Sequence, residues 1–470
     1  MSTTKPAAIH PSSIHGTPKP LRHPQRPRSI PARRVKLRVT PGVTPGVTLG
    51  VTLKGTRPRW YPPGMASVTD SRTTRAGGSD PRAADRPDTP ADPQADTASR
   101  PGPGDAGSSW IFSAPLDLLV FLGPILLSAL LLPILAGAER EHTPLWAYVG
   151  FVVAVDVAHV WATLFRTYLD TAELRRRPAL YTLPIPIILI ISFLLFRQGS
   201  WLFWTAAAYF AIFHFIRQDY GFLALYRHRA GETELIDRRL DALALTAGAL
   251  GPVLLWHASP SRRFDWFGAG ERFLFGQGGL SPALRPIILG LWGLAAALWL
   301  GRLIQRARAG RPVSRGKVLF MVLVHLRWSI GSLFDHPLVS LAFINLFHGL
   351  PFVALVWRCV ERGWREREPE TWSERLLSSL ALSRRWWIYL IILIALALGE
   401  ELTWEVLVWR DYLPADAALA LPELGRNGTA LAVSVLALPQ LLHYFLDGFI
   451  WKMDGSNPGL REWLLTPDPA

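Results

Sequence analysis

Apolar runs of about 20 residues, the length that a membrane-spanning helix needs, recur through residues 109–470. Proline residues or short polar turns separate them. This pattern predicts an all-α fold, a polytopic transmembrane helix bundle with about ten spans. We expect the spans at 112–136, 144–168, 178–197, 201–226, 240–257, 281–305, 317–334, 337–360, 385–408 and 427–451.

Residues 1–108 differ sharply from the rest of the chain. They are rich in Pro, Gly, Ser, Thr, Arg and Asp and show almost no apolar periodicity. Such a segment cannot bury enough apolar surface to offset its conformational entropy, so we expect it to be disordered. No apolar run follows the early charges, and no signal peptide is expected. Met65 opens a polar lead-in, and we hypothesise that residues 1–64 are a mis-called extension.

Arginine residues are concentrated in the loops that follow every second predicted span, and the other loops carry far fewer, apart from 258–280. Because positive residues mark cytoplasmic loops, this alternation places both termini in the cytoplasm, in a multi-pass protein of the cell membrane. The arginines concerned are Arg175, Arg176, Arg177, Arg227, Arg229, Arg238, Arg239, Arg306, Arg308, Arg311, Arg315, Arg358, Arg362, Arg365, Arg367 and Arg375.

Two segments between the spans have a pattern of their own. Residues 258–280 are aromatic and Gly-rich, which is typical of a re-entrant or interfacial cap on the outer face. Residues 361–384 place Trp and Leu among charges, and they predict a cytoplasmic amphipathic helix.

The composition agrees with a membrane protein. Half of the residues are hydrophobic and 18% are charged, against about 25% charged in soluble proteins. A net charge of +14 would suggest nucleic acid in a soluble protein. Here the arginines lie beside apolar runs, so we expect membrane lipids as partners and no nucleic acid. The single cysteine, Cys359, excludes an intrachain disulfide and a cysteine-ligated zinc or iron–sulfur site.

Titratable side chains inside the spans are the strongest functional signal. Such groups are costly at membrane depth and usually serve a function. A histidine lies near the middle of five predicted spans, one in each helix and all at about the same depth, an arrangement typical of a metal site in a bundle core. A purely structural role in hydrogen bonding between helices is the alternative. The expected ligands are His159, His214, His325, His348 and His443.

Acidic side chains share helix faces with two of these histidines. Asp156 precedes His159 by three residues, and Asp447 follows His443 by four. Side chains at these spacings are neighbours on a helix. A carboxylate at this position either ligates the metal or holds the imidazole in one tautomer. We therefore count both aspartates among the candidate catalytic residues.

Two arginines complete the candidate catalytic set. Arg166 and Arg217 lie on the cytoplasmic halves of their predicted spans. They either extend to the membrane interface or neutralise Asp170 and Asp219; an anionic headgroup or a substrate carboxylate is a further partner for them. In the span at 385–408, Glu400 and Glu401 are candidates for a proton relay or for a polar cavity that opens outward.

Several histidines with carboxylates and no thiolate suit iron, zinc, manganese or copper. In general character the pattern is similar to membrane iron oxygenases, including the bacterial carotenoid-cleaving type, in which histidines from several spans hold iron. It departs from fatty-acid desaturases, because the chain has no His-x-x-His-His or His-x-x-x-His box. The polar stretches that carry the likeness are 156–170, 214–221, 345–352 and 443–452.

We therefore expect a metal-dependent membrane oxidoreductase, with non-haem iron as the first choice. Its substrate would be a lipid or isoprenoid that arrives from the bilayer, and an electron donor would be a further partner. A proton- or ion-coupled transporter that uses the same histidines and acids is the runner-up, and a haem protein is the third reading. No Walker loop, dinucleotide fingerprint, nucleophile elbow or His-Glu-x-x-His motif occurs in the sequence.

Overall fold

The computed structural model describes residues 110–138, 143–259, 279–334, 336–414, 416, 421 and 423–466. The chain divides into Met1–Pro90 and Ala91–Ala470, and every described residue belongs to the second unit. The predictions for residues 1–108, for a start at Met65 and for most of 258–280 lie outside the described residues. All regular elements within the described residues are helices, which confirms the all-α prediction.

Seven helical segments are long and apolar enough to cross a membrane, and an eighth is added if one bent pair counts as a single span. The bent pair consists of α17 (Arg426–Leu436) and α18 (Leu438–Ile450). The seven segments are Ala114–Gly137 (α1, η1, α2), Leu145–Arg166 (α3, η2, α4), Pro178–Gln198 (α6, α7), Leu235–His257 (α9), Pro282–Arg308 (η3, α10), Arg315–Leu333 (α11) and Pro337–Gly363 (α12, η4, α13).

The remaining two predicted spans, 201–226 and 385–408, are also helical. They correspond to α8 (Ser200–Arg229) and to α15 (Trp386–Trp404) with the π-helical turn η5 (Glu405–Trp409). Neither is among the segments that meet the criteria for length and apolarity. A membrane bundle with seven or eight candidate spans is therefore confirmed, and a total of about ten stays a prediction.

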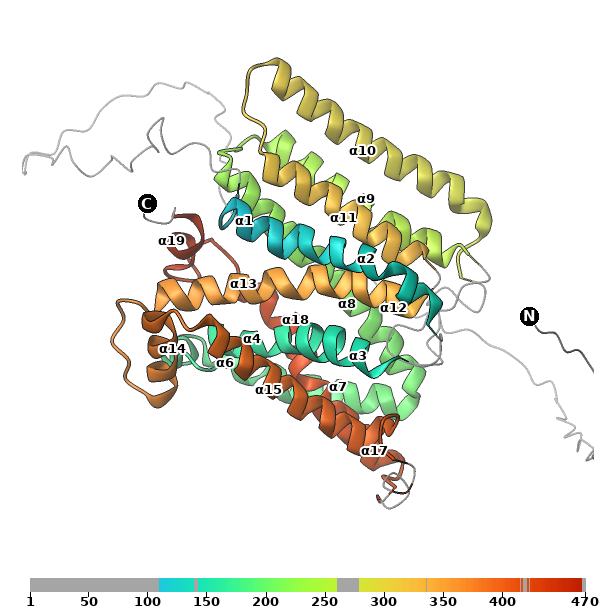
Figure 1. Ribbon diagram of the computed structural model, residues 1–470, viewed down its shortest axis with the longest axis vertical. Helices are drawn as coiled ribbons and strands as arrows, with labels where there is room; N and C mark the ends of the chain where they lie inside the picture. The colour runs from blue at the N-terminus through green and yellow to red at the C-terminus, as the bar shows by residue number, and fades with distance from the viewer. Residues whose placement is uncertain are drawn as a thin grey trace, which may run out of the picture. The chain divides into compact units, whose positions relative to one another are not determined.

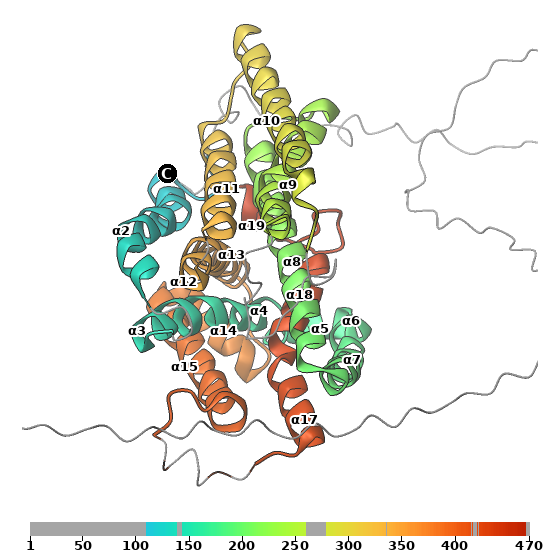
Figure 2. The same cartoon turned by 90° about the vertical axis from the view of Figure 1, so that its right-hand side faces the viewer.

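Helix α13 (Leu346–Gly363) lies in the middle of the bundle and packs against α4 (Ala158–Arg166), while α10 and α17 lie at opposite edges (Figure 1 and Figure 2). Helices α7 (Pro184–Gln198) and α10 (Arg285–Arg308) are mostly exposed at the periphery of the bundle. Helix α9 is more deeply buried, because it packs between α10 and α11. Ion pairs from Asp237 to Arg302 and Arg306 of α10 fix this contact.

Several spans in the bundle, including the one that contains α13, are irregular. The π-helical segments η2 (Tyr148–Val157) and η4 (Leu341–Asn345) lead directly into α4 and α13. Helix α18 meets α17 at a bend of 41°, next to Ala437. A π-helical turn changes the direction in which the later side chains of the helix point. Such turns are frequent at functional sites.

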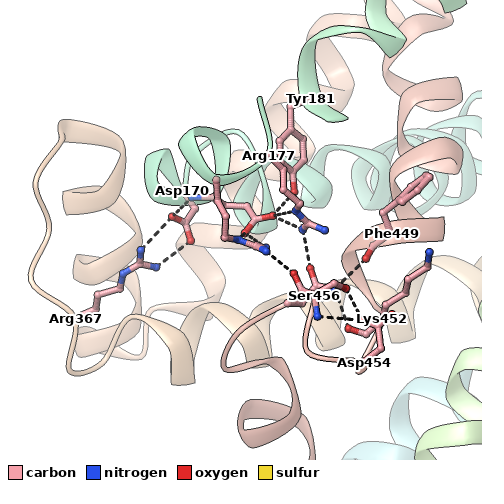
Figure 3. A network of polar contacts seen from close by, with 11 residues as sticks. Asp170, Arg177, Tyr181, Arg367, Phe449, Lys452, Asp454 and Ser456 are labelled. Carbon is pink, nitrogen blue, oxygen red and sulfur yellow. Dashed lines mark hydrogen bonds and ion pairs between the residues drawn. The ribbon is translucent and has the colours of Figure 1, made fainter. Parts of the chain in front are cut away.

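A polar network fixes the short helix α5 (Thr171–Arg176) to distant parts of the chain (Figure 3). Arg177 donates to Glu173 and, at 2.7 Å, to Asn457 in the loop before α19 (Leu460–Leu465). Asp170 accepts from Arg367 at 3.0 Å. Arg367 lies in the loop before α14 (Trp372–Ser383), and α14 confirms the helix expected within 361–384.

Candidate metal centre

Four histidines from four helices meet inside the bundle. His159 lies on α4, His214 on α8, His348 on α13 and His443 on α18. Each histidine has a ring nitrogen that points into the cluster, and these four nitrogens lie within 4.8 Å of one another. All four side chains are buried. The structure thus brings together four of the five predicted ligands.

The four rings form a closed cycle of edge-to-face contacts. The ring of His159 lies 4.7 Å from that of His348 and 4.9 Å from that of His443, measured between centroids. The ring of His214 lies 4.9 Å from that of His348 and 4.7 Å from that of His443. Every ring therefore contacts two others, and all four surround one central point.

These distances fit a single metal ion. A bond of about 2.1 Å places an imidazole centroid about 3.3 Å from a metal, so neighbouring centroids lie about 4.7 Å apart in a square arrangement and about 5.4 Å apart in a tetrahedral one. The observed 4.7–4.9 Å falls between these limits. Nitrogens bound on opposite sides of a metal lie about 4.2 Å apart. A spread of 4.8 Å needs only small ring movements to reach that value.

Protein oxygens lie beside the outer nitrogen of two of these imidazoles. The Nδ1 atom of His443 lies 2.8 Å from the Thr163 hydroxyl, and that of His159 lies 3.3 Å from the Val155 carbonyl. The Nε2 atoms of the same two histidines are buried and have no hydrogen-bond partner. A proton on Nδ1 leaves a lone pair on Nε2, which is the form that binds a metal.

The contact between His214 and His348 points to the same conclusion. Their Nε2 atoms lie only 3.2 Å apart. Two lone pairs at this distance repel each other, so either one nitrogen carries a proton or a cation lies between them. The Nδ1 atom of His348 is buried without a partner, so whichever nitrogen bears the proton, one polar atom of this ring has no partner in the protein.

Asp447 and Asp156 lie behind the histidines and outside the group of four. The carboxylate of Asp447 is 3.8 Å from His214 Nδ1 and 3.7 Å from His443 Nδ1. That of Asp156 is 4.0 Å from His159 Nδ1. Of the two roles expected for these aspartates, the geometry favours orientation of the rings over direct ligation.

His325 lies outside the cluster. Its Nδ1 atom is 2.9 Å from the Met321 carbonyl, and its ring stacks against Trp292 with centroids 6.3 Å apart. It also fills the space above Gly248, where a Cβ atom would come within 2.5 Å of the ring. His325 therefore packs α11 against α9 and α10 and faces away from the four other histidines.

The two predicted arginines do not contact the aspartates that we assigned to them. Asp219 pairs with Arg327, and Asp170 pairs with Arg367. The sequence could not show this, because both partners come from segments that are distant along the chain. Arg217 is exposed.

The side chain of Arg166 is buried and lies over the ring of Trp463 in α19, 5.5 Å from its centroid. It therefore packs against the C-terminal segment of the chain.

Arg327 supports the centre in a way that the sequence analysis missed. It is fully buried and donates to the Ile344 carbonyl in η4 at 3.0 Å, as well as to Asp219. Gln218 donates to the backbone carbonyl of His348 at 2.8 Å. These bonds connect α8, α11 and α13 around the centre. An arginine inside an apolar run was the available signal for Arg327.

A group of acidic side chains lies on the other side of α4. Trp161 donates to Glu400 at 2.8 Å, and Tyr148 donates to Glu401. Asp156 belongs to η2, which packs against α15, and it lies beside His159. Carboxyl groups thus extend from α15 to the edge of the histidine cluster.

Comparisons with protein-family models, with curated proteins and with solved structures found no match for this chain. The functional conclusion therefore rests on the residues of the site.

Proposed function

We propose that the four-histidine cluster binds one transition-metal ion and that the protein is a membrane oxidoreductase acting on a lipid or isoprenoid. Iron is the first choice of metal, with zinc, manganese and copper as the other candidates. The observation that carries the proposal is the convergence of four buried imidazoles, of which His159 and His443 have Nε2 atoms without a hydrogen-bond partner. An unpaired buried polar group is costly, and a metal bond removes that cost.

The packing of the rings favours a bare ion over haem. A porphyrin held between two axial histidines needs a flat slot between their rings. Here neighbouring rings lie 4.7–4.9 Å apart and contact each other edge to face. The ring centroid of Phe215 lies 4.0 Å from that of His348, and the ring centroid of Phe352 lies 4.9 Å from that of His443. Aromatic side chains therefore close two sides of the centre.

A redox-active ion bound here would supply electron transfer to dioxygen or polarise a substrate group. The chain's own residues would orient and shield the site. Thr163 and Asp447 fix the ring of His443, and Tyr444 stacks on His214 at 4.3 Å. If both atoms of dioxygen enter the substrate, the reaction needs no further reactant. Insertion of one atom, with the other reduced to water, takes two electrons and two protons from an external donor.

The proposal includes the full membrane arrangement. Helices α8 and α15 would cross together with the seven segments and the bent pair, which gives about ten spans. Both termini would face the cytoplasm, and the protein would reside in the cell membrane. The presence of His214 on α8 supports this, because α8 must lie alongside the membrane-embedded part of α13.

Isotope labelling tests the proposed reaction. Full-length protein in lipid nanodiscs is loaded with Fe(II) without oxygen and then exposed to ¹⁸O₂ with a membrane lipid extract and a reductant. We expect ¹⁸O in an isoprenoid or lipid product with the wild type and none with His159→Ala. The same experiment is run with the other three metals, and no labelled product with any of the four would contradict an oxygen-dependent reaction.

An ion-coupled transporter is a second candidate, because interrupted helices and midplane titratable groups are typical of transporters. The segments η2 and η4 and the bend between α17 and α18 are interruptions of this kind. Proteoliposomes separate the two functions. A transporter acidifies or alkalises the lumen in the presence of a metal chelator, whereas the oxidoreductase is inactive in a chelator and moves no protons.

A further inference from the structure

A pocket of about 400 Å³ lies between α4, α15 and the bend of α17 and α18. This volume is within the range of roughly 300–1,000 Å³ that is typical of small-molecule sites. Most of its wall is aliphatic, and the lining side chains belong to surfaces that face away from the bundle core. The residues that matter for its chemistry are Trp161, Gly399, Glu400, Thr403, Val435 and Pro439.

Helix α15 forms one wall as a shallow groove. Ala395, Gly399 and Thr403 recur at steps of four and therefore lie on one face of the helix. At Gly399 an added Cβ atom would meet no atom within 4 Å, so the groove is open along this face. A long apolar chain can lie in such a groove.

The polar end of the pocket is the carboxyl group of Glu400. Trp161 donates to one of its oxygens at 2.8 Å, and Trp404 donates to the other at 3.4 Å. Each oxygen keeps a free lone pair after these bonds. The two indoles hold the carboxyl group in place, and one further hydrogen-bonding group can join it from within the pocket.

The pocket also lies close to the histidine cluster. Pro439 in its wall lies one helical turn before His443 on α18, and Trp161 lies two residues after His159 on α4. A molecule in the pocket is therefore separated from the centre by these two helices.

We propose that this pocket binds a long-chain alcohol from the bilayer, with its hydroxyl group on Glu400 and its chain in the α15 groove. A hydroxyl group both donates and accepts, so it suits a carboxyl group in either protonation state. A carboxylate ligand would meet the like charges of Glu400 and Glu401, and an ammonium group would lose its hydration at membrane depth. As the route to the metal centre, the assignment rests on the proposed function; as a lipid site, it stands alone.

Photolabelling tests the assignment with the full-length protein in nanodiscs. The probe is a long-chain alcohol with a diazirine in its chain, and the matched probes are the corresponding hydrocarbon and amine. Peptide mass spectrometry locates the cross-links. We expect them in 395–403 and 435–439, with an excess of unlabelled alcohol as an effective competitor.

Two variants and a control complete the test. Gly399→Leu fills the groove and should abolish the label in these peptides. Gly290→Leu is the control, because it adds the same side chain at an equally open site on the peripheral helix α10 and should change nothing. Glu400→Met, which keeps the length of the side chain but removes its hydrogen-bonding atoms, should reduce the preference for the alcohol over the hydrocarbon about fivefold, which is within the range for one hydrogen bond.

Labels spread equally over α7, α10 and α15, or labels unaffected by Gly399→Leu, would overturn the site. Stronger labelling by the amine than by the alcohol would overturn the choice of an alcohol. The labelling is repeated after chelation of metal. Pocket labelling in a protein that binds no metal would leave the lipid site intact and count only against the proposed function.

Discussion

The Nε2 atoms of His214 and His348 lie 3.2 Å apart, although the two residues are separated by 134 positions in the chain and come from different helices. Both side chains are buried. The protein thus holds two histidine nitrogens closer than two lone pairs tolerate without a proton or a cation between them. This relationship is the basis of the predictions about the metal centre.

Asp447 should control metal affinity through the rings that it faces. In Asp447→Asn the carboxylate near His214 and His443 becomes a neutral amide that no longer selects the Nδ1–H tautomer. We expect metal affinity to fall about 10- to 100-fold, as is usual for groups behind metal ligands, while the fold is kept. Competition with a chromogenic chelator measures the change. Asp454→Asn, an exposed site in the C-terminal loop, is the control, and an equal loss in both variants would refute the role of Asp447.

In the buried ion pair between Arg327 and Asp219, removal of one residue should destabilise the protein more than removal of both. Arg327→Leu leaves a buried carboxylate without its cation, which costs about 3–5 kcal/mol. The double variant Arg327→Leu, Asp219→Leu should recover much of this stability. It should not recover metal binding, because the bond from Arg327 to the Ile344 carbonyl beside His348 stays lost. Denaturant titration and metal analysis of the three variants separate the two effects, and full recovery of both would show that Arg327 has no positioning role.

Gly349 allows α13 to approach η2 closely. A Cβ atom at this position would lie 2.8 Å from Val155 Cγ1 and 3.1 Å from the Val155 carbonyl oxygen. Gly349→Val should therefore push the two helices apart and destabilise the protein by about 1–3 kcal/mol, with loss of metal. Gly293→Val on α10, where an added Cβ meets no atom within 4 Å, should leave metal binding unchanged. Thermal unfolding monitored by circular dichroism checks the first effect.

Glu173 should make stability depend on pH outside the membrane. Burial raises the pKa of this carboxyl group, but the hydrogen bonds from Tyr181, Arg176 and Arg177 outweigh burial and hold the pKa below its ordinary value. A carboxyl group with a lowered pKa stabilises the fold above its ordinary pKa of about 4.3, and this contribution disappears as the pH falls through the lower, folded-state pKa.

Glu173→Gln should therefore be less stable than the wild type at pH 7, and the difference should shrink below about pH 4, where the wild type itself becomes protonated. Melting temperatures between pH 3 and 7 report the trend. A difference that stays constant across this range would contradict the assignment.

The convergence of four histidines could be predicted because titratable residues are conspicuous within apolar runs. His159, His214, His348 and His443 lie near the middle of their helices, so their common depth follows from the sequence. The sequence does not show as easily which side of each helix points toward the centre of the bundle. His325 has a similar depth but points toward Trp292 and α9.

The sequence could not predict the partners across helices or the local irregularities. The π-helical segment η4 rotates His348 relative to the first turns of its span, and nothing in the apolar pattern of 337–360 indicates such a turn. The pairs of Asp219 with Arg327 and of Asp170 with Arg367 depend on which helices become neighbours in space. Long-range packing decides these contacts, and a single sequence does not encode it in a readable pattern.

Metal content is the most direct test of the central claim. Full-length protein is purified in detergent, loaded with Fe(II), Zn(II), Mn(II) or Cu(II) in turn, desalted and analysed for metal and protein. We predict one ion per chain for at least one metal, with iron the first choice. The double variant His159→Ala, His443→Ala should bind none, and His325→Ala should bind as the wild type does. Wild-type protein that retains no metal, or a double variant that retains as much as the wild type, would contradict the account.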